Sequence, residues 1–123
     1  MKLLRHYSFV FTLLLAAGQF SCNKAGQAEV FEATLVDAFC AFNIVTIEDP
    51  AFYKLGMNWK NAQGTTLEHV FSVGNPCDFN KEQLRKGDRF RCKIIETPRD
   101  STCAVCMGYM ETPPLTYHIE VIR

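Results

Sequence analysis

The sequence predicts a mainly β domain over residues 30–123, a small five-stranded barrel with one short helix. Three observations support this prediction. Apolar and polar residues alternate with a period of two along several segments, as they do in half-buried strands. A segment between the third and fourth of these strands carries helix-capping signals instead. Turn-forming residues separate the segments, and the longest separation contains Cys103 and Cys106.

The first expected strand, residues 30–47, is long and interrupted. Its apolar residues Phe31, Ala33 and Leu35 alternate with polar ones, and the apolar pattern resumes after an irregular stretch at residues 37–40. We therefore expect one long strand with a break in its middle.

A hairpin is expected next. Residues 53–60 and 65–73 both alternate, and four turn-forming residues, 61–64, join them. In the second arm, four residues share one parity and should face the same side of the sheet: Leu67, His69, Phe71 and Val73.

A short helix is expected between Asn80 and Gly87. Asn80 is a suitable N-cap, and Gln83 stands three residues later, as in a capping box. Phe79 and Leu84 occupy the two positions of a hydrophobic staple. Gly87 is then suited to the C′ position that ends the helix.

Alternation returns in residues 88–96 and 115–121, on either side of a long loop at residues 98–114. Three strands, a short helix and two strands is the order of an OB-fold, a five-stranded Greek-key barrel. Closing this barrel should bring eight residues into one core: Phe42, Ile44, Trp59, Phe71, Phe90, Ile94, Tyr117 and Ile119.

Three features of this domain resemble a known family. They are the broken strand bearing Cys40, the expected helix ahead of Asp88-Arg89-Phe90, and the cysteine loop ahead of the closing strand Tyr-His-Ile-Glu-Val-Ile. Together they resemble the small OB-like lipoproteins of Gram-negative envelopes, the NigD-like group. The resemblance implies a fold and a location more than a mechanism, because the activity of that group is largely undefined.

The N-terminal residues 1–21 are typical of a secretory signal peptide. Lys2 and Arg5 precede a short apolar run at residues 9–17, which is too short to span a bilayer. The run leads through Phe20-Ser21 into Cys22, which resembles a lipoprotein signal whose cysteine is acylated and becomes the first mature residue. Residues 22–29 then form a polar tether.

The predicted location follows from this signal. The mature chain should be anchored by its acyl chains to the outer membrane of the cell envelope, with the periplasmic side favoured because no acidic run follows Cys22. Gln19 replaces the usual leucine of such signals, so cleavage near Ala17 and secretion is the alternative. Removal of Lys2 and Arg5 leaves 11 basic against 13 acidic side chains, a balance that argues against a nucleic-acid partner.

Five cysteines remain after Cys22, so two disulfides and one leftover thiol are expected in an oxidising compartment. Cys40 lies at the break of the first strand and should tie down the long loop through Cys103 or Cys106, with a slight preference for Cys103. Cys77 and Cys92 are a less certain second pair, because the parity of Cys92 also suits a small apolar core residue.

Two functions fit these observations. The favoured one is a non-enzymatic, membrane-tethered module that binds an envelope protein or a small ligand through its loops, without a cofactor. The alternative is a thiol-redox or copper-handling protein. In that case Cys103 and Cys106 would react as a pair, or bind Cu(I) together with the thioethers of Met107 and Met110. The redox reading lacks the expected helix after the first cysteine, because Gly108 and Pro113-Pro114 follow too closely.

Overall fold

The computed structural model describes residues 29–123. The expected signal peptide, the acylation site Cys22 and most of the tether lie outside these described residues. Among residues 29–123, no helix has the length and apolar character needed to cross a membrane.

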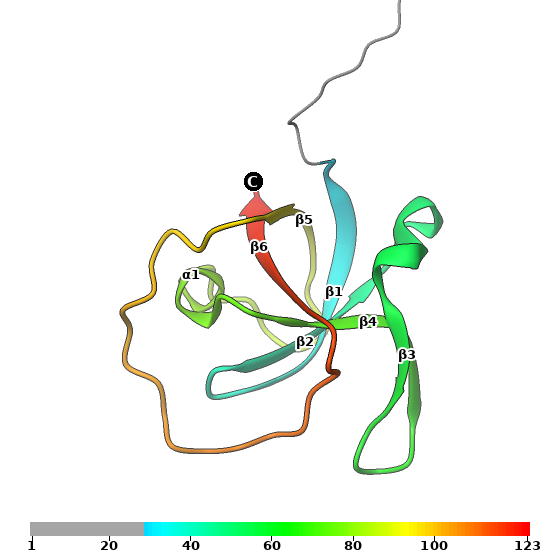
Figure 1. Ribbon diagram of the computed structural model, residues 1–123, viewed down its shortest axis with the longest axis horizontal. Coiled ribbons are helices and arrows are strands. Elements are labelled where there is room, and N and C mark those ends of the chain that lie inside the picture. Colours follow the sequence, from blue (N-terminus) through cyan, green and yellow to red (C-terminus); the bar gives the residue numbers. More distant parts are fainter. Residues whose placement is uncertain (1–28) are drawn as a thin grey trace, which may run out of the picture.

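Five strands close into a barrel (Figure 1). They are β1 (Phe31–Phe39), β2 (Phe42–Ile47), β4 (Thr66–Val73), β5 (Arg89–Ile95) and β6 (Thr116–Ile122). The pairing of β2 with β4 completes the ring, and β6 lies between β4 and β5, where it runs parallel to β4. The prediction of a mainly β, five-stranded OB-like Greek-key barrel with one short helix is therefore confirmed, and the structure adds a 3₁₀ helix to it.

The prediction of a single broken first strand was wrong. Residues 31–47 form a hairpin in which β1 and β2 pair antiparallel, and the chain reverses at Cys40, whose φ is 54°. The irregular stretch contains this turn, and a β-bulge lies just before it. The bulge follows from the register, because Leu35 pairs with Val45 whereas Asp37 pairs with Ile44, the very next residue of β2 in the pairing. The extra residue, Val36, reverses the side to which the following side chains point.

The first arm of the expected hairpin also differs from the prediction. Its strand, β3 (Met57–Lys60), is short and pairs only with β4, so it stands outside the closed ring. A 3₁₀ helix, η1 (Pro50–Leu55), occupies the preceding residues, and Asp49 caps it by accepting a hydrogen bond from the amide of Ala51.

The α-helix lies upstream of the expected position. α1 spans Pro76–Asn80, with Pro76 in its first turn, whereas Gln83 has a φ of 54° and belongs to a turn. Burial of Phe79 explains the difference: its ring packs edge-on against Phe90 at 5.6 Å and is fixed inside the core rather than in an exposed staple. Gly87 does adopt a positive φ, 95°, but it lies in a second turn, which the hydrogen bond from the amide of Asp88 to the carbonyl of Arg85 closes, and not at the end of a helix.

The core lies inside the ring and at its α1 end. Eleven residues form it: Phe31, Ala33, Leu35, Val45, Ile47, Phe71, Val73, Phe79, Phe90, Cys92 and Ile119. Of the eight residues expected in the core, Phe71, Phe90 and Ile119 are central, and Ile94 and Tyr117 pack against them.

The other three expected core residues lie elsewhere. Ile44 is buried, but strand alternation puts it on the outer face of the barrel, opposite to Val45. Phe42 shares that outer face and contacts Tyr109, and Trp59 borders an open cleft. The outer face of β1, β2 and β4 therefore carries a second apolar layer.

Candidate functional site

A cleft of about 510 Å³ opens on this outer face. The β3–β4 hairpin forms one side, and the long loop before β6 forms the other. Its lining combines an aromatic ring and aliphatic side chains with amide and charged groups: Val36, Asp37, Ile44, Trp59, Asn61, Ala62, Gln63, Thr65, Leu67, Lys86, Met110 and Glu111. Small-molecule sites commonly have this composition, in which apolar surface provides affinity and a few polar groups orient the ligand.

A second bulge directs Trp59 and Leu67 toward the cleft. Trp59 pairs with Leu67 whereas Met57 pairs with Val70, so β4 has one residue more than β3 between these pairs. The bulged residue His69 has a φ of 58°, and its ring stacks on Tyr53 with centroids 3.6 Å apart.

This bulge corrects the prediction that Leu67, His69, Phe71 and Val73 share one face. Phe71 and Val73 belong to the core, whereas Leu67 borders the cleft. Gly56 permits the bulge, because a Cβ at this position would lie 2.5–2.7 Å from backbone atoms of His69.

Polar groups around the cleft are held in place locally. The side-chain oxygen of Asn61 accepts hydrogen bonds from the amides of Gln63 and Thr65 at 3.1 and 2.9 Å, which fixes the turn between β3 and β4. Across the cleft, Asp37 and Lys86 form an exposed ion pair at 3.7 Å. The side chains of Gln63 and Glu111 are exposed at the rim.

We name residues 98–114 the strap, because this loop wraps around α1 and then crosses the outer face of the barrel. Two disulfides hold it: Cys77 to Cys103 and Cys40 to Cys106, with Cα–Cα distances of 5.5 and 5.3 Å. Cys40 therefore ties the strap as expected. The preference for Cys103 was wrong, and so was the less certain pairing of Cys77 with Cys92.

Cys92 is the free cysteine among the described residues and lies fully buried in β5. Burial raises the pKa of its thiol to about 12, because the interior disfavours the thiolate. Cys92 therefore acts as a small apolar core residue, which was the alternative to its pairing with Cys77.

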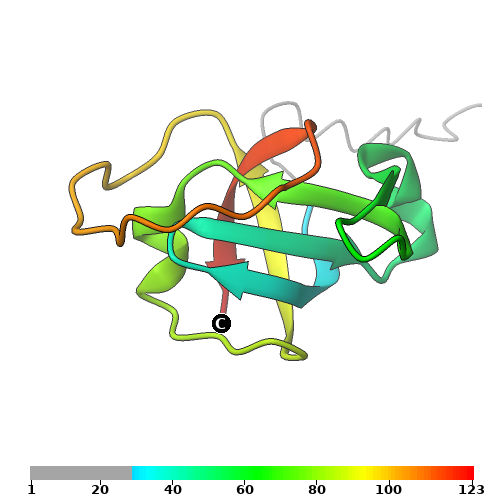
Figure 2. The same cartoon turned by 90° about the horizontal axis from the view of Figure 1, so that it is seen from below.

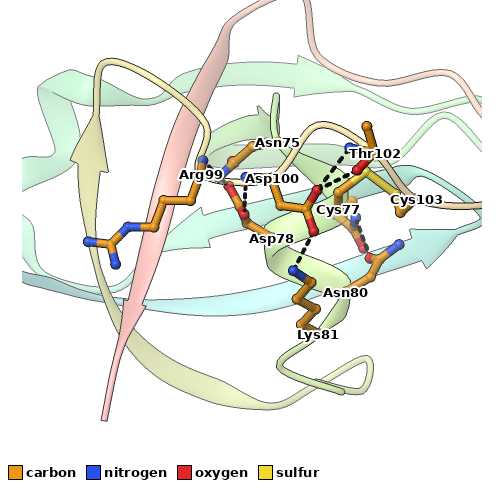
Figure 3. Close-up of a disulfide and its surroundings, with 10 residues drawn as sticks. Asn75, Cys77, Asp78, Asn80, Lys81, Arg99, Asp100, Thr102 and Cys103 are labelled. Atoms are coloured by element: carbon orange, nitrogen blue, oxygen red, sulfur yellow. Dashed lines mark hydrogen bonds and ion pairs between the residues drawn. A yellow bond between two sulfur atoms is a disulfide. The ribbon is translucent and has the colours of Figure 1, made fainter.

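Carboxylates anchor the beginning of the strap (Figure 3). Asp78, in α1, accepts hydrogen bonds from the backbone amides of Arg99 and Asp100, each at 2.9 Å, and from the side chain of Asn75 at 3.0 Å. Asp100 in turn forms an ion pair with Lys81 and accepts two hydrogen bonds from Thr102.

These contacts shift two carboxyl pKa values downward. For Asp78, partial desolvation raises the pKa, but the hydrogen bonds from Asn75, Arg99 and Asp100 outweigh this effect and the net shift is downward. For Asp100, the hydrogen bond from Lys81, assisted by those from Thr102, lowers the pKa to about 2. Both groups are therefore ionised at neutral pH.

The second half of the strap follows the outer face of the barrel residue by residue. Gly108 lies against the ring of Phe39, where a Cβ would overlap that ring. The ring of Tyr109 meets that of Phe42 edge-on at 5.5 Å. Further along, Pro113 is buried, and its carbonyl accepts a hydrogen bond from the hydroxyl of Ser72 at 3.2 Å. Figure 2 shows the backbone of the strap, in orange, running across the side of the barrel that β2 and β4 form.

The expected reactive residues of the strap do not converge in this structure. Cys103 and Cys106 are bonded to different elements, α1 and the β1–β2 turn. Met107 projects fully into solvent, whereas Met110 borders the cleft. A thiolate pair for redox chemistry or for Cu(I) would require both disulfides to be reduced.

Sequence reasoning missed the carboxylate anchor and the cleft. No sequence pattern marks the roles of Asp78, Gly108 and Pro113, because the residues that each of them contacts lie far away in sequence. Comparison of this chain with protein-family models, with curated proteins and with solved structures gave no match. The fold and the geometry of the cleft are therefore the basis for assigning a function.

Proposed function

We propose that this protein is a membrane-tethered, non-enzymatic binding module of the cell envelope, which holds a small ligand in the cleft beside Trp59. The apolar run that ends at Phe20-Ser21-Cys22 supports an acylated Cys22 as the anchor, in the outer membrane and on its periplasmic side. The resemblance to NigD-like lipoproteins supports the same location. The observation that carries the binding role is the cleft itself, in which an indole side chain lies beside aliphatic residues on the face of a closed barrel.

The composition of the cleft favours a compact ligand with one apolar face and several hydroxyl or amide groups, such as a short glycan. The indole of Trp59 and the side chain of Leu67, both half-buried, offer apolar surface against which a sugar face can pack, and Ile44 lies buried beneath them. Gln63 and Glu111 can exchange hydrogen bonds with hydroxyl groups at the rim. Because Asp37 and Lys86 pair with each other, the cleft does not require a strongly charged ligand.

Fluorescence tests this proposal directly, because Trp59 is the single tryptophan of the chain. The full-length mature protein would be titrated with neutral oligosaccharides and soluble peptidoglycan fragments. We expect a saturable change in indole emission for at least one probe. Calorimetry should show that Trp59→Ala weakens binding of that probe roughly tenfold. Lys60→Ala, next in sequence but outside the cleft, is the matched control; equal losses in both variants would refute the assignment.

Anchoring is tested separately. Intact-mass analysis of the membrane fraction should find Cys22 acylated, and Cys22→Ser should release the protein from the membrane. Recovery of the wild type with an unmodified N-terminus near Gln19 would instead support secretion.

The thiol-redox or copper alternative is tested by counting thiols. With both disulfides formed, the described residues contain one free thiol, Cys92, and its burial should keep it unreactive until the protein is denatured. Two or more thiols that react in the native protein, or stoichiometric Cu(I) binding without added reductant, would favour the alternative.

A further inference from the structure

The tip of the β1–β2 hairpin and the strap residues bound to it form an exposed apolar surface. Val30 aside, the large hydrophobic residues exposed in the described part of the chain all lie here: Phe39, Val105, Met107 and Tyr109, with exposed fractions of 49, 51, 103 and 77%. The Cys40–Cys106 disulfide joins the two segments, and Gly108 and Tyr109 contact Phe39 and Phe42 across them. We name these four residues the apolar tip.

The apolar tip is ordered without being covered. Two disulfides within four residues restrain the backbone of the strap, so less backbone conformational entropy remains to be lost on binding. Residues 101–110 carry no charged side chain. Exposed methionine, tyrosine and phenylalanine in a charge-free patch match the composition found at the centre of protein interfaces.

The backbone of the strap also has unused hydrogen-bonding capacity. Among the described residues, no backbone-to-backbone hydrogen bond involves residues 101–112; the amide of Thr102 bonds to the side chain of Asp100 instead. Hydrocarbon cannot satisfy such groups, whereas the peptide and side-chain groups of a protein can. The nearby Lys81 is paired with Asp100, so the tip offers no free cation for an anionic lipid headgroup.

The position of the apolar tip, at the end of β1 away from the tether, also favours a protein partner over the membrane. β1 begins at Phe31, which follows the tether in sequence, and ends at Phe39, which belongs to the apolar tip. Figure 1 shows β1 running across the barrel from one end to the other. Eight residue steps of about 3.3 Å separate these two ends by roughly 26 Å. A domain tethered at one end of β1 thus presents the tip at the other end.

We propose that the apolar tip is the docking surface for a partner protein, and that Met107 and Tyr109 insert into an uncharged apolar groove on that protein. The cleft beside Trp59 is a separate surface, so this inference does not depend on the ligand of the cleft. Met107 makes the sharpest probe, because its side chain is fully exposed and its replacement removes no contact within the domain.

Site-specific photo-crosslinking in the native cell tests this inference. A photoreactive phenylalanine analogue would replace Met107 in the full chain, and in a second strain Tyr109, with exposed Lys60 of β3 as the control position. We expect one discrete adduct with another protein from both tip positions and none from position 60. The crosslinked protein, once identified and purified, should bind the wild type directly.

Binding measured with that purified partner decides the residue assignment. Met107→Ser should weaken it roughly tenfold, and the double variant Cys40→Ser/Cys106→Ser should weaken it as well, whereas Trp59→Ala should leave it unchanged. Circular dichroism would verify that each variant is folded.

Four outcomes would overturn the inference. Two concern the crosslinking: no adduct at positions 107 and 109, or equal adducts at position 60. The third is a dimer of this chain that Met107→Ser abolishes. The fourth is flotation of the non-acylated domain with vesicles of phosphatidylethanolamine and phosphatidylglycerol that Met107→Ser abolishes. The last two would identify a second copy or the bilayer as the occupant. None of these outcomes affects the test of the cleft by Trp59 fluorescence.

Discussion

The barrel and the strap belong to one chain but are stabilised by different interactions. In the barrel, every strand of the ring is hydrogen-bonded to two other strands of the ring, and β4 also to β3; eleven buried residues fill the interior. In the strap, residues 101–112 make no backbone ladder within the described chain, and two disulfides and the carboxylate of Asp78 determine its course. Burial of apolar surface specifies the first region, whereas covalent ties specify the second.

This difference indicates how the two regions should respond to perturbation. Apolar burial does not depend on the redox state of the solution, but the path of the strap does. Both candidate surfaces need the strap, since Met110 and Glu111 border the cleft and Met107 and Tyr109 form most of the apolar tip. Reducing conditions should therefore affect binding before they affect the barrel.

The largest effect should come from the core. Phe71 is fully buried at the centre of the barrel, where it contacts Phe31 and Tyr117. We expect Phe71→Ala to lower the free energy of unfolding by about 3–5 kcal/mol, measured by urea denaturation. Val105→Ala in the exposed strap should change it by less than about 0.5 kcal/mol. Similar losses in both variants would contradict the division between the two regions.

Removal of the disulfides should come next. The Cys40–Cys106 bond spans 66 residues, and its loss in Cys40→Ser/Cys106→Ser should lower the free energy of unfolding by about 4 kcal/mol on the loop-entropy model. The Cys77–Cys103 bond spans 26 residues, and the same model gives about 3.5 kcal/mol for it. Hydrogen exchange of the double variant should show native protection of β1, β5 and β6. Loss of protection in those strands at low denaturant would mean that the barrel depends on the strap.

Two glycines give a matched comparison of smaller size. A Cβ at Gly56 would meet backbone atoms of His69, which cannot move without breaking the β3–β4 register. At Gly108 it would meet side-chain atoms instead of backbone: the ring of Phe39, which is half-exposed and can rotate away, and the Sγ of Cys40 at 2.9 Å. We expect Gly56→Ala to cost about 1–3 kcal/mol and Gly108→Ala less than about 1 kcal/mol in thermal or urea unfolding. The reverse order would refute this account.

The smallest effect concerns the carboxylate anchor. The pKa values of Asp78 and Asp100 are lower in the folded protein than in the unfolded chain, so their stabilising contribution is complete above about pH 4. It is lost as the pH falls toward 2, the folded pKa of Asp100. The protection of the Arg99 and Asp100 amides, measured as the exchange rate relative to the intrinsic rate at the same pH, should fall over this range while the core amides stay protected. Asp78→Asn should accelerate the same amides at neutral pH by weakening one or both hydrogen bonds, at a cost of about 1 kcal/mol.

The barrel could be predicted from sequence because strand alternation reports which face is buried. Phe31, Ala33 and Leu35 alternate and do point into the core. The pattern failed where a bulge changed the parity, and for this reason Trp59 was expected in the core but borders the cleft. A single extra residue such as Val36 or His69 leaves no mark in the composition of its segment.

The α-helix and the strap could not be placed for a different reason, because their positions depend on contacts distant in sequence. Asn80 and Gln83 have the residue types of a capping box, but Phe79 needed a place in the core, and this requirement moved the helix upstream. Choosing between Cys103 and Cys106 as the partner of Cys40 required the course of the strap in space. That course also assembles the cleft and the apolar tip, so neither surface could be derived from sequence alone.

The spacing of Cys103 and Cys106 affects how the protein must be produced. In the unfolded chain these two thiols are three residues apart and will usually meet each other before they meet Cys77 or Cys40, because short loops close at lower entropic cost. When the reduced chain is oxidised, the first bond is therefore expected to be a non-native one between Cys103 and Cys106. Cys92 can also form non-native bonds while it is still exposed. Thiol–disulfide exchange must then redistribute the bonds. The yield of correctly bonded protein should accordingly depend on a disulfide isomerase in the compartment where it folds, rather than on the oxidant alone.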